Sequence, residues 1–366
     1  MHTMHSTLLV GLYDWEPERL PRQEFEQRIE AFWKRMPASC AGVAVYGDRR
    51  YNAELAYFTN LVPKLRDGLA LIPRNGVPKV LVSGGANAMP PAARQTWLQK
   101  VDPLADPGKA IAAWKAELGG PVALIGGEQL RQAVRKGVDE ALSGDSLSEQ
   151  AAAVLREQMR CKRPAELAAL RESCAMLKAV VSELDRAKRK GLGVIAAIIE
   201  AEHAARGAEE VRTLFSLDGG KTLRPFTTPI ERSVDPLQAY IAVRHLGYWA
   251  DGYVMLSNGA HAASDKARQV LKSAIAAAKP GVSCRDIAQR VKSGIAPYQE
   301  HSITAGDAGG GIGLALEEAP RLSPESDQKL QPGDVISLRV GVSDGASHAI
   351  VSTMSAITER GNEVLW

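Results

Sequence analysis

Residues Gly309 to Pro320 read G-G-G-I-G-L-A-L-E-E-A-P. Three successive glycines, with another at Gly313, describe backbone that turns tightly or lies close to other backbone, because glycine enters left-handed conformations without a steric cost. The apolar residues between the glycines favour packing against a core. The stretch therefore predicts an ordered segment rather than a plain connecting loop.

This stretch resembles the G-H-G-I-G-L-x-L-H-E-x-P segment of the creatinase, aminopeptidase P and methionine aminopeptidase family, the pita-bread enzymes. Gly310 stands where that family has a metal-binding histidine, and Glu317 where it has a catalytic one. The residues R-C-K-R-P-A-E-L from Arg160 to Leu167 also resemble the family's K-x-P-x-E-L helix start, with Pro164 in the first turn, where its missing N–H is not needed. The resemblance covers roughly Arg160 to Trp366.

Length and pattern indicate two domains, since 366 residues exceed one ordinary core. The first, residues 1–155, alternates strands and helices and is expected to be a small creatinase-type α/β domain. Its expected elements are a helix at 23–36, strands at 41–46, 69–72, 79–82 and 122–125, and helices at 108–118 and 128–142. A polar, turn-rich segment at 143–148 then predicts a boundary near Leu155.

The second domain, residues 156–366, has helical spacing in four segments and strand patterns in four others. The helices are expected at 165–189, 194–205, 265–279 and 284–292, and the strands at 239–243, 249–256, 335–342 and 348–358. This arrangement is similar to the pita-bread layout of helices outside a curved antiparallel sheet. The expected fold class is therefore α+β, with a C-terminal pita-bread domain.

Composition narrows the class of protein. The content is 45% hydrophobic and 24% charged, with a formal net charge of +3, and no dense basic block indicates nucleic-acid binding. The four cysteines are scattered, which predicts neither a zinc ribbon nor a disulfide scaffold. No segment reaches membrane-spanning length, and the first residues lack a secretory pattern. We expect a cytoplasmic protein that binds neither nucleic acid nor membrane.

The resembled enzymes hold two divalent metal ions between two aspartates, one histidine and two glutamates, and the ions activate a bridging water. The corresponding positions in this sequence, taken in that order, are His245, Leu256, Gly310, Arg339, and Ser352 or one of its neighbours in I-V-S-T-M. The first two come from matching the motif D-L-G-x-x-x-x-G-Y-x-x-D to His245-Leu246-Gly247 and Gly252-Tyr253. No carboxylate remains, and Arg339 brings a fixed positive charge. The resemblance therefore implies a protein without metal or other cofactor.

The altered pocket still offers ionisable groups. Candidate catalytic residues are His245, Glu317 and Glu318, because histidine and a buried glutamate can move protons near neutrality. Candidate substrate-binding residues are Arg339, Arg66, Ser352, Phe226 and His348. Asp251 is a further candidate.

Two of these positions come from the resemblance alone. Phe226 stands where creatinase keeps its acid/base histidine, so creatinase chemistry cannot be copied. Arg66 stands where creatinase-like members place an arginine that reaches the substrate carboxylate of a neighbouring subunit, a task that suits a bidentate guanidinium.

Each candidate has a structural alternative. In this alternative, Glu318 and Arg339 form a buried ion pair in place of the metals, and His245 is a hydrogen-bonded core residue. Asp251 is then a turn residue, and Arg66 an exposed arginine in a turn.

Three functions remain open. The first is a metal-independent hydrolase or lyase that cleaves a C–N bond of a small, carboxylate-bearing, amino-acid-like substrate. The second is a non-catalytic pseudopeptidase that binds a ligand or protein. The third is a metallopeptidase with a different ligand set. The resemblance also implies a homodimer.

Overall fold

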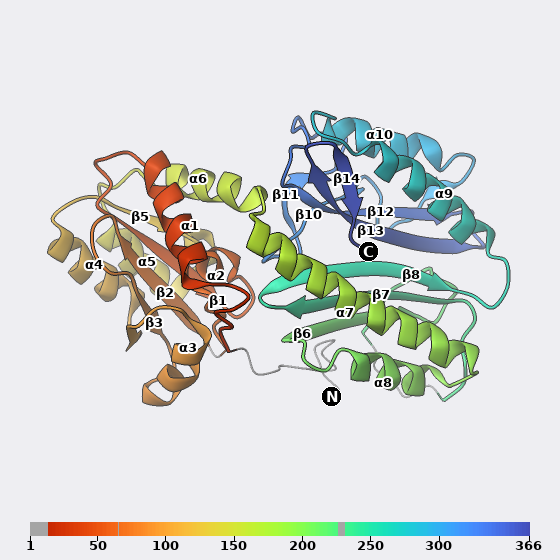
Figure 1. The fold of residues 1–366 in the computed structure, drawn as a ribbon, viewed down its shortest axis with the longest axis horizontal. Coiled ribbons are helices and arrows are strands. Elements are labelled where there is room, and N and C mark those ends of the chain that lie inside the picture. The colour runs from red at the N-terminus through yellow and green to blue at the C-terminus, as the bar shows by residue number, and fades with distance from the viewer. Residues whose placement is uncertain (1–13, 65, 226–230) are drawn as a thin grey trace. The chain divides into compact units, whose positions relative to one another are not determined.

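The computed structural model describes residues 14–64, 66–225 and 231–366 (Figure 1). The described chain forms two compact units, residues 14–159 and 160–366. They join at the end of helix α6 (Ser148–Arg160), so the predicted boundary near Leu155 falls inside this helix.

The first unit is built on a five-stranded sheet in the order β4-β3-β2-β1-β5 (Figure 1). Its strands are β1 (Gly42–Asp48), β2 (Asp67–Pro73), β3 (Lys79–Val82), β4 (Val101–Pro103) and β5 (Val122–Ile125). Its helices are α1 (Arg22–Arg35), α2 (Ala53–Thr59), α3 (Met89–Gln95), α4 (Pro107–Leu118), α5 (Gln132–Ala141) and α6, with 3₁₀ turns η1 (Ala86–Ala88) and η2 (Gly127–Gln129).

Both faces of this sheet are covered, which explains why β1 is apolar along almost its whole length. On one face, Ile111 and Trp114 of α4 are buried against residues of β1 and β2. Gly42 makes this close approach possible, because a Cβ there would lie 2.5 Å from the Trp114 ring. Strand β1 pairs antiparallel with β2 and parallel with β5, so the unit is a mixed α/β domain.

The second unit contains two sheets. One has the order β11-β10-β12-β13-β14 with β9 paired to β12, and the other has the order β6-β7-β8. The strands are β6 (Glu210–Ser216), β7 (Leu237–His245), β8 (Tyr248–Leu256), β9 (Gln299–Glu300), β10 (Gly309–Gly311), β11 (Glu318–Arg321), β12 (Val335–Ser343), β13 (His348–Thr358) and β14 (Gly361–Val364). The helices are α7 (Pro164–Arg189), α8 (Val194–Ala204), α9 (Ala262–Ala277) and α10 (Cys284–Gly294).

The two sheets meet where β8 lies beside β13. The Gln238 amide joins them, because its Nε2 donates to the Ile350 carbonyl at 2.9 Å and its Oε1 accepts from the Ile350 N–H at 2.8 Å. Tyr253 N–H donates to Ser352 Oγ at 2.8 Å nearby. Together the strands form a layer that α7 and α8 cover over β6–β8, and α9 and α10 cover over β12 and β13 (Figure 1). The expected α+β class is confirmed.

The helix start predicted at Pro164 is also present. Pro164 is the first residue of α7, and Glu166 Oε2 accepts the Arg163 N–H at 3.1 Å, which caps the start of the helix. The other Glu166 oxygen accepts the Tyr248 hydroxyl at 3.1 Å. This capping carboxylate therefore fixes α7 to the start of β8.

A buried ion pair links the start of the second unit to its sheet. Arg160 Nε lies 2.7 Å from Asp334 Oδ1, and Arg160 Nη2 lies 2.8 Å from Asp334 Oδ2. The two side chains are 6% and 0% exposed. Gln331 N–H donates to the same carboxylate at 2.8 Å, so Asp334 is held by two partners.

No helix in the described part of the chain is both long and apolar enough to span a bilayer.

Helix α8 carries a titratable group that predicts a pH effect on stability. Burial raises the pKa of Glu202 to about 7, although a hydrogen bond from Thr213 lowers it. Because the folded pKa exceeds the unfolded value, stability is lost as pH rises from about 4.5 through 7. Glu202→Gln should therefore be more stable than the wild type at pH 8 by ~1–2 kcal/mol, a value discounted for partial exposure, and similar to it at pH 4.

Urea unfolding at the two pH values measures this difference. The matched control is Glu359→Gln, at an exposed position after β13. An equal gain at pH 4 and pH 8, or the same gain in the control, would contradict the assignment.

Candidate functional site

A cavity of about 260 Å³ opens in the second unit beside strands β10, β11 and β12. It is lined by charged, polar and glycine residues, with one apolar side chain. The lining residues are Asp251, Asp307, Gly309, Gly310, Gly311, Leu316, Glu317, Glu318, Arg321, Ser337 and Arg339. The glycine stretch therefore forms one wall of the cavity.

The glycines are required by close backbone packing. Gly309 has a φ of 108°, and a Cβ there would lie 1.9 Å from the Ser337 carbonyl oxygen. A Cβ on Gly311 would lie 2.2 Å from the Ala319 carbonyl oxygen. Strand β10 pairs with both β11 and β12, so any side chain at these two positions would push the strands apart. The cavity wall is consequently backbone.

Arg339 and Asp307 form the main ion pair of the cavity. Arg339 Nη2 lies 2.5 Å from Asp307 Oδ2, and Arg321 Nη2 lies 3.3 Å from the same oxygen. Burial opposes the charge of Arg339, but Asp307 and neighbouring groups outweigh it and raise the pKa of the guanidinium. Its buried Nε has no hydrogen-bond partner among the described residues. One N–H of this cation is therefore buried without an acceptor among the described residues.

Asp251 is the most deeply buried acid of the cavity, with 4% of its surface exposed. Burial raises its pKa above the usual value, although Ser337 and the charge of Arg339 lower it. Its Oδ1 atom has no hydrogen-bond partner within the described parts of the chain. Tyr240 also donates toward this carboxyl group. Burial thus makes Asp251 a weaker acid than an exposed aspartate, and holds a proton on it to higher pH.

The two glutamates differ in their surroundings. Glu318 is paired, because its Oε2 lies 2.5 Å from Lys162 Nζ and its Oε1 accepts the Ala315 N–H at 2.9 Å. Glu317 lines the same cavity but is exposed. The structural alternative for Glu318 is therefore correct in kind, but its partner is Lys162 and not Arg339.

His245 does not lie in the cavity, so its predicted place there is wrong. It is the last residue of β7 and pairs with Tyr248 across the turn. Its Nε2 lies 3.5 Å from Glu172 Oε2. Leu256, matched to the second aspartate, pairs with Leu237 at the far end of the same hairpin, about 25 Å away at the rise of a β-strand. The two positions cannot belong to one metal centre.

The motif G-Y-x-x-D fits a second place in the sequence, Gly247-Tyr248-Trp249-Ala250-Asp251. The structure favours this match, because Asp251 lines the cavity and pairs with Ala242 on the neighbouring strand. One acidic position is therefore kept, and the inference that no carboxylate remains is wrong. The error arose because both Gly247-Tyr248 and Gly252-Tyr253 satisfy the G-Y part of the motif.

Two other candidates also lie outside the cavity. Ser352 pairs with Arg339 across β12 and β13, and its hydroxyl accepts the Tyr253 N–H. His348 Nδ1 lies 2.9 Å from Ser343 Oγ, and its ring packs edge-on against His301 at 5.8 Å. Both side chains make contacts within the sheet and do not line the cavity, which contradicts the prediction that they do.

The last two candidates cannot be placed in this cavity. Phe226 lies outside the described residues. Arg66 is an exposed residue of the first unit, and its contact with a neighbouring subunit stays a prediction.

Sequence reasoning missed Asp307, Arg321 and Ser337. Asp307 stands two residues before the glycine run, and Arg321 directly follows its closing proline. Their nearness in sequence to the glycine stretch is the signal that could have identified them as cavity residues. Ser337 could have been found from strand alternation, because it shares a face of β12 with Arg339.

The arrangement defines a pita-bread domain whose sheet carries a cavity lined by ionisable side chains. Comparison with known proteins identifies its family. The model of metallopeptidase family M24 matches residues 168–359, more than half of the chain. The chain belongs to metallopeptidase family M24. No curated protein sequence matches it.

Solved structures share the whole fold. The prolidase from Pyrococcus horikoshii OT3 matches with a TM-score of 0.74 and 16% identity, over 94% of this chain and 98% of that one. The Xaa-Pro dipeptidase from Bacillus anthracis matches with a TM-score of 0.73 and 17% identity, over 93% and 97%. Aminopeptidase P from E. coli matches with a TM-score of 0.69 and 16% identity, over 94% of each chain. These identities establish the fold alone.

The cavity residues do not fit the metal centre that the family name implies. Divalent ions need several oxygen or nitrogen donors arranged around one point. Across the described residues, no three His, Cys, Asp or Glu side chains are grouped in that way. Asp307 and Glu318 are already paired with Arg339 and Lys162, and the Arg339 cation would repel a metal ion.

Proposed function

We propose that this chain is a metal-independent member of family M24. It cleaves a C–N bond, by hydrolysis or elimination, in a small amino-acid-like molecule that carries a carboxylate. The observation that supports this function most strongly is that one cavity holds both the buried Asp251 carboxyl group, whose pKa burial raises, and the Arg339 guanidinium. Such cleavage requires a general acid and a group that stabilises negative charge on the substrate.

The charges of the cavity favour a molecule with both an anionic and a cationic end. Arg339 and Arg321 both line the cavity, and Arg321 is 67% exposed, so these guanidinium groups can receive a carboxylate. Glu317 is exposed in the same cavity and can receive an ammonium group. A zwitterionic ligand would match both ends, whereas an uncharged one would leave them unused.

Asp251 would donate its proton to the leaving nitrogen, which then departs as a neutral amine. In hydrolysis, water supplies the oxygen that replaces nitrogen on carbon, and the Glu317 carboxylate accepts the proton that this water loses. In elimination, the neighbouring carbon loses a proton, and Glu317 is the carboxylate that can accept it. The cation of Arg339 would stabilise negative charge that develops on the substrate.

The second candidate is a non-catalytic binding protein. The position of His245 outside the cavity supports it, because no described histidine lines this cavity as an acid/base. The cavity would then hold the same zwitterionic class of molecule without converting it. Formation of product separates the two candidates.

Chelation tests the metal-independent mechanism. We expect cleavage of dipeptides or of ureido and amidino acids, followed by mass spectrometry, to persist after prolonged treatment with EDTA and 1,10-phenanthroline. Elemental analysis should find no stoichiometric metal. A metal-dependent M24 peptidase treated in parallel should lose its activity. Loss of turnover that Mn²⁺ or Zn²⁺ restores would instead establish the metallopeptidase alternative.

The homodimer implied by the family resemblance is part of this proposal. In it, Arg66 of one subunit would contact the substrate carboxylate of the other. Light scattering of the purified chain at micromolar concentration measures the assembly, and a monomer with full activity would exclude this role of Arg66.

A further inference from the structure

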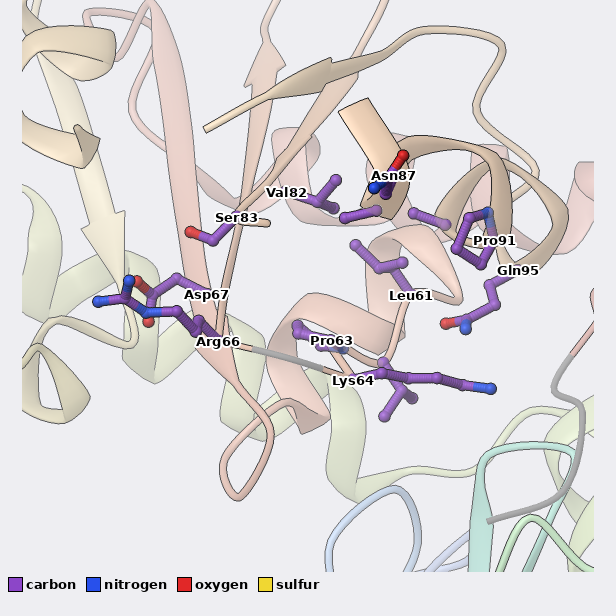
Figure 2. Close-up of a pocket in the computed structure, with 13 residues that line it drawn as sticks. Leu61, Pro63, Lys64, Arg66, Asp67, Val82, Ser83, Asn87, Pro91 and Gln95 are labelled. Carbon is purple, nitrogen blue, oxygen red and sulfur yellow. The ribbon is translucent and has the colours of Figure 1, made fainter. Parts of the chain in front are cut away.

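The first unit contains a second cavity, of about 230 Å³ (Figure 2). It lies where the chain before β2, the end of β3 and helix α3 come together. Its walls are mainly apolar and include Leu61, Val82 and Ala92, which are 1%, 5% and 6% exposed. This volume is below the range for drug-sized ligands, so a small molecule would fill it.

One buried polar group of this cavity lacks a partner. Gln95 ends α3 and is 3% exposed. Its backbone carbonyl accepts the Asn60 Nδ2 at 2.9 Å, which fixes the residue in place. Its side-chain Oε1 has no hydrogen-bond partner among the described residues. A buried acceptor of this kind costs free energy until a donor reaches it.

Water is a poor occupant at this point, because a buried water needs two to four polar partners and the nearby walls are apolar. A ligand with an N–H group and a hydrocarbon body satisfies both the acceptor and the walls.

The charged residues that line the cavity are Lys64, Arg66 and Asp67. Asp67 is occupied, because its Oδ2 lies 2.5 Å from Arg131 Nη2 and its Oδ1 accepts the Tyr46 hydroxyl at 2.8 Å. Figure 2 shows the Arg66 side chain extending away from Leu61, Pro91 and Gln95. Asn87 and Gln95 contribute uncharged amides to the same lining, and of these two only Gln95 is buried.

We propose that this cavity binds a small uncharged amide with a hydrocarbon body, whose N–H donates to Gln95 Oε1. The hydrocarbon body lies against Leu61, Val82 and Ala92. This site belongs to the first unit alone, so its presence does not depend on the proposed cleavage reaction.

The test titrates the full chain with three matched probes, followed by saturation-transfer NMR. The probes are 3-phenylpropanamide, its methyl ester counterpart methyl 3-phenylpropanoate, and the anion 3-phenylpropanoate. The amide should bind about tenfold more tightly than the ester, which has no N–H to donate. Tighter binding of the anion than of the amide, or equal binding of amide and ester, would overturn the proposal.

Two variants locate the site. Gln95→Met keeps the size of the side chain but removes the acceptor, and should bring the ratio of amide to ester affinity close to one. A purely structural role of Gln95 would leave that ratio unchanged. Ala92→Leu fills the cavity and should weaken all three probes, while Ala113→Leu, on the exposed side of α4, should weaken none. Equal effects of the two leucine variants would contradict the assigned location.

Discussion

Asp251→Asn is expected to lower kcat by ~10²–10⁴-fold, the usual contribution of a general acid. Asparagine keeps the shape of the carboxyl group but cannot supply its proton to a leaving nitrogen. Because the burial of Asp251 already favours the neutral form, the uncharged amide should leave the fold intact. The measurement is steady-state turnover of the substrate identified after chelation, with a thermal melt of each variant to verify folding.

The pH profile provides a second readout of Asp251. Burial raises its pKa, and a general acid acts only when protonated. The wild-type kcat should therefore fall as pH rises through that pKa, and Asp251→Asn should lack this limb. If Asp251→Asn retains turnover within about threefold, a value far below the general-acid range, Asp251 is not the acid.

Asp334→Ala is expected to reduce the free energy of unfolding by ~3–5 kcal/mol. The change leaves the buried Arg160 guanidinium without its charged partner, in a place where that side chain is only 6% exposed. It also removes the acceptor of the Gln331 N–H. Equilibrium unfolding in urea at pH 7 measures the loss.

The matched control is Glu363→Ala. Glu363 accepts two hydrogen bonds from Arg171, at 3.0 and 2.7 Å, so the geometry resembles that of the Arg160 pair. Both side chains of this pair are more than 40% exposed, and exposed pairs contribute ~0–1 kcal/mol. Similar losses of unfolding free energy in the two variants would show that burial does not determine how much the Arg160–Asp334 pair contributes to stability.

The sequence predicted the second unit well where long periodic segments occur. The expected helix at 165–189 is α7 (Pro164–Arg189), and the strands expected at 335–342 and 348–358 are β12 and β13. Short elements were missed, including α2 (Ala53–Thr59) and α3 (Met89–Gln95). Seven residues give two helical turns, too few for apolar periodicity to stand out from chance. The expected helix at 128–142 is interrupted, because residues 127–129 form a 3₁₀ turn before α5.

The site was harder to predict because its contacts are distant in sequence. Lys162 and Glu318 are separated by 156 residues, and Arg339 and Asp307 by 32. Motif matching located the glycine wall and Arg339, because each lies in a short stretch whose own residue order identifies it. It placed His245 wrongly because two G-Y pairs, Gly247-Tyr248 and Gly252-Tyr253, fit the motif. The position of the β7–β8 turn, which motif matching does not give, is needed to choose between them.

The Arg339–Asp307 ion pair and the glycine wall together determine what a divalent metal site in this cavity would require. Replacing Arg339 with glutamate would set a second acid against Asp307 and take away its counter-charge. Placing a histidine at Gly310 would put a Cβ 2.9 Å from the Pro320 carbonyl oxygen, so the backbone of β11 would have to shift. Each change alone is thus unfavourable, and a metal site built here would need several coordinated substitutions.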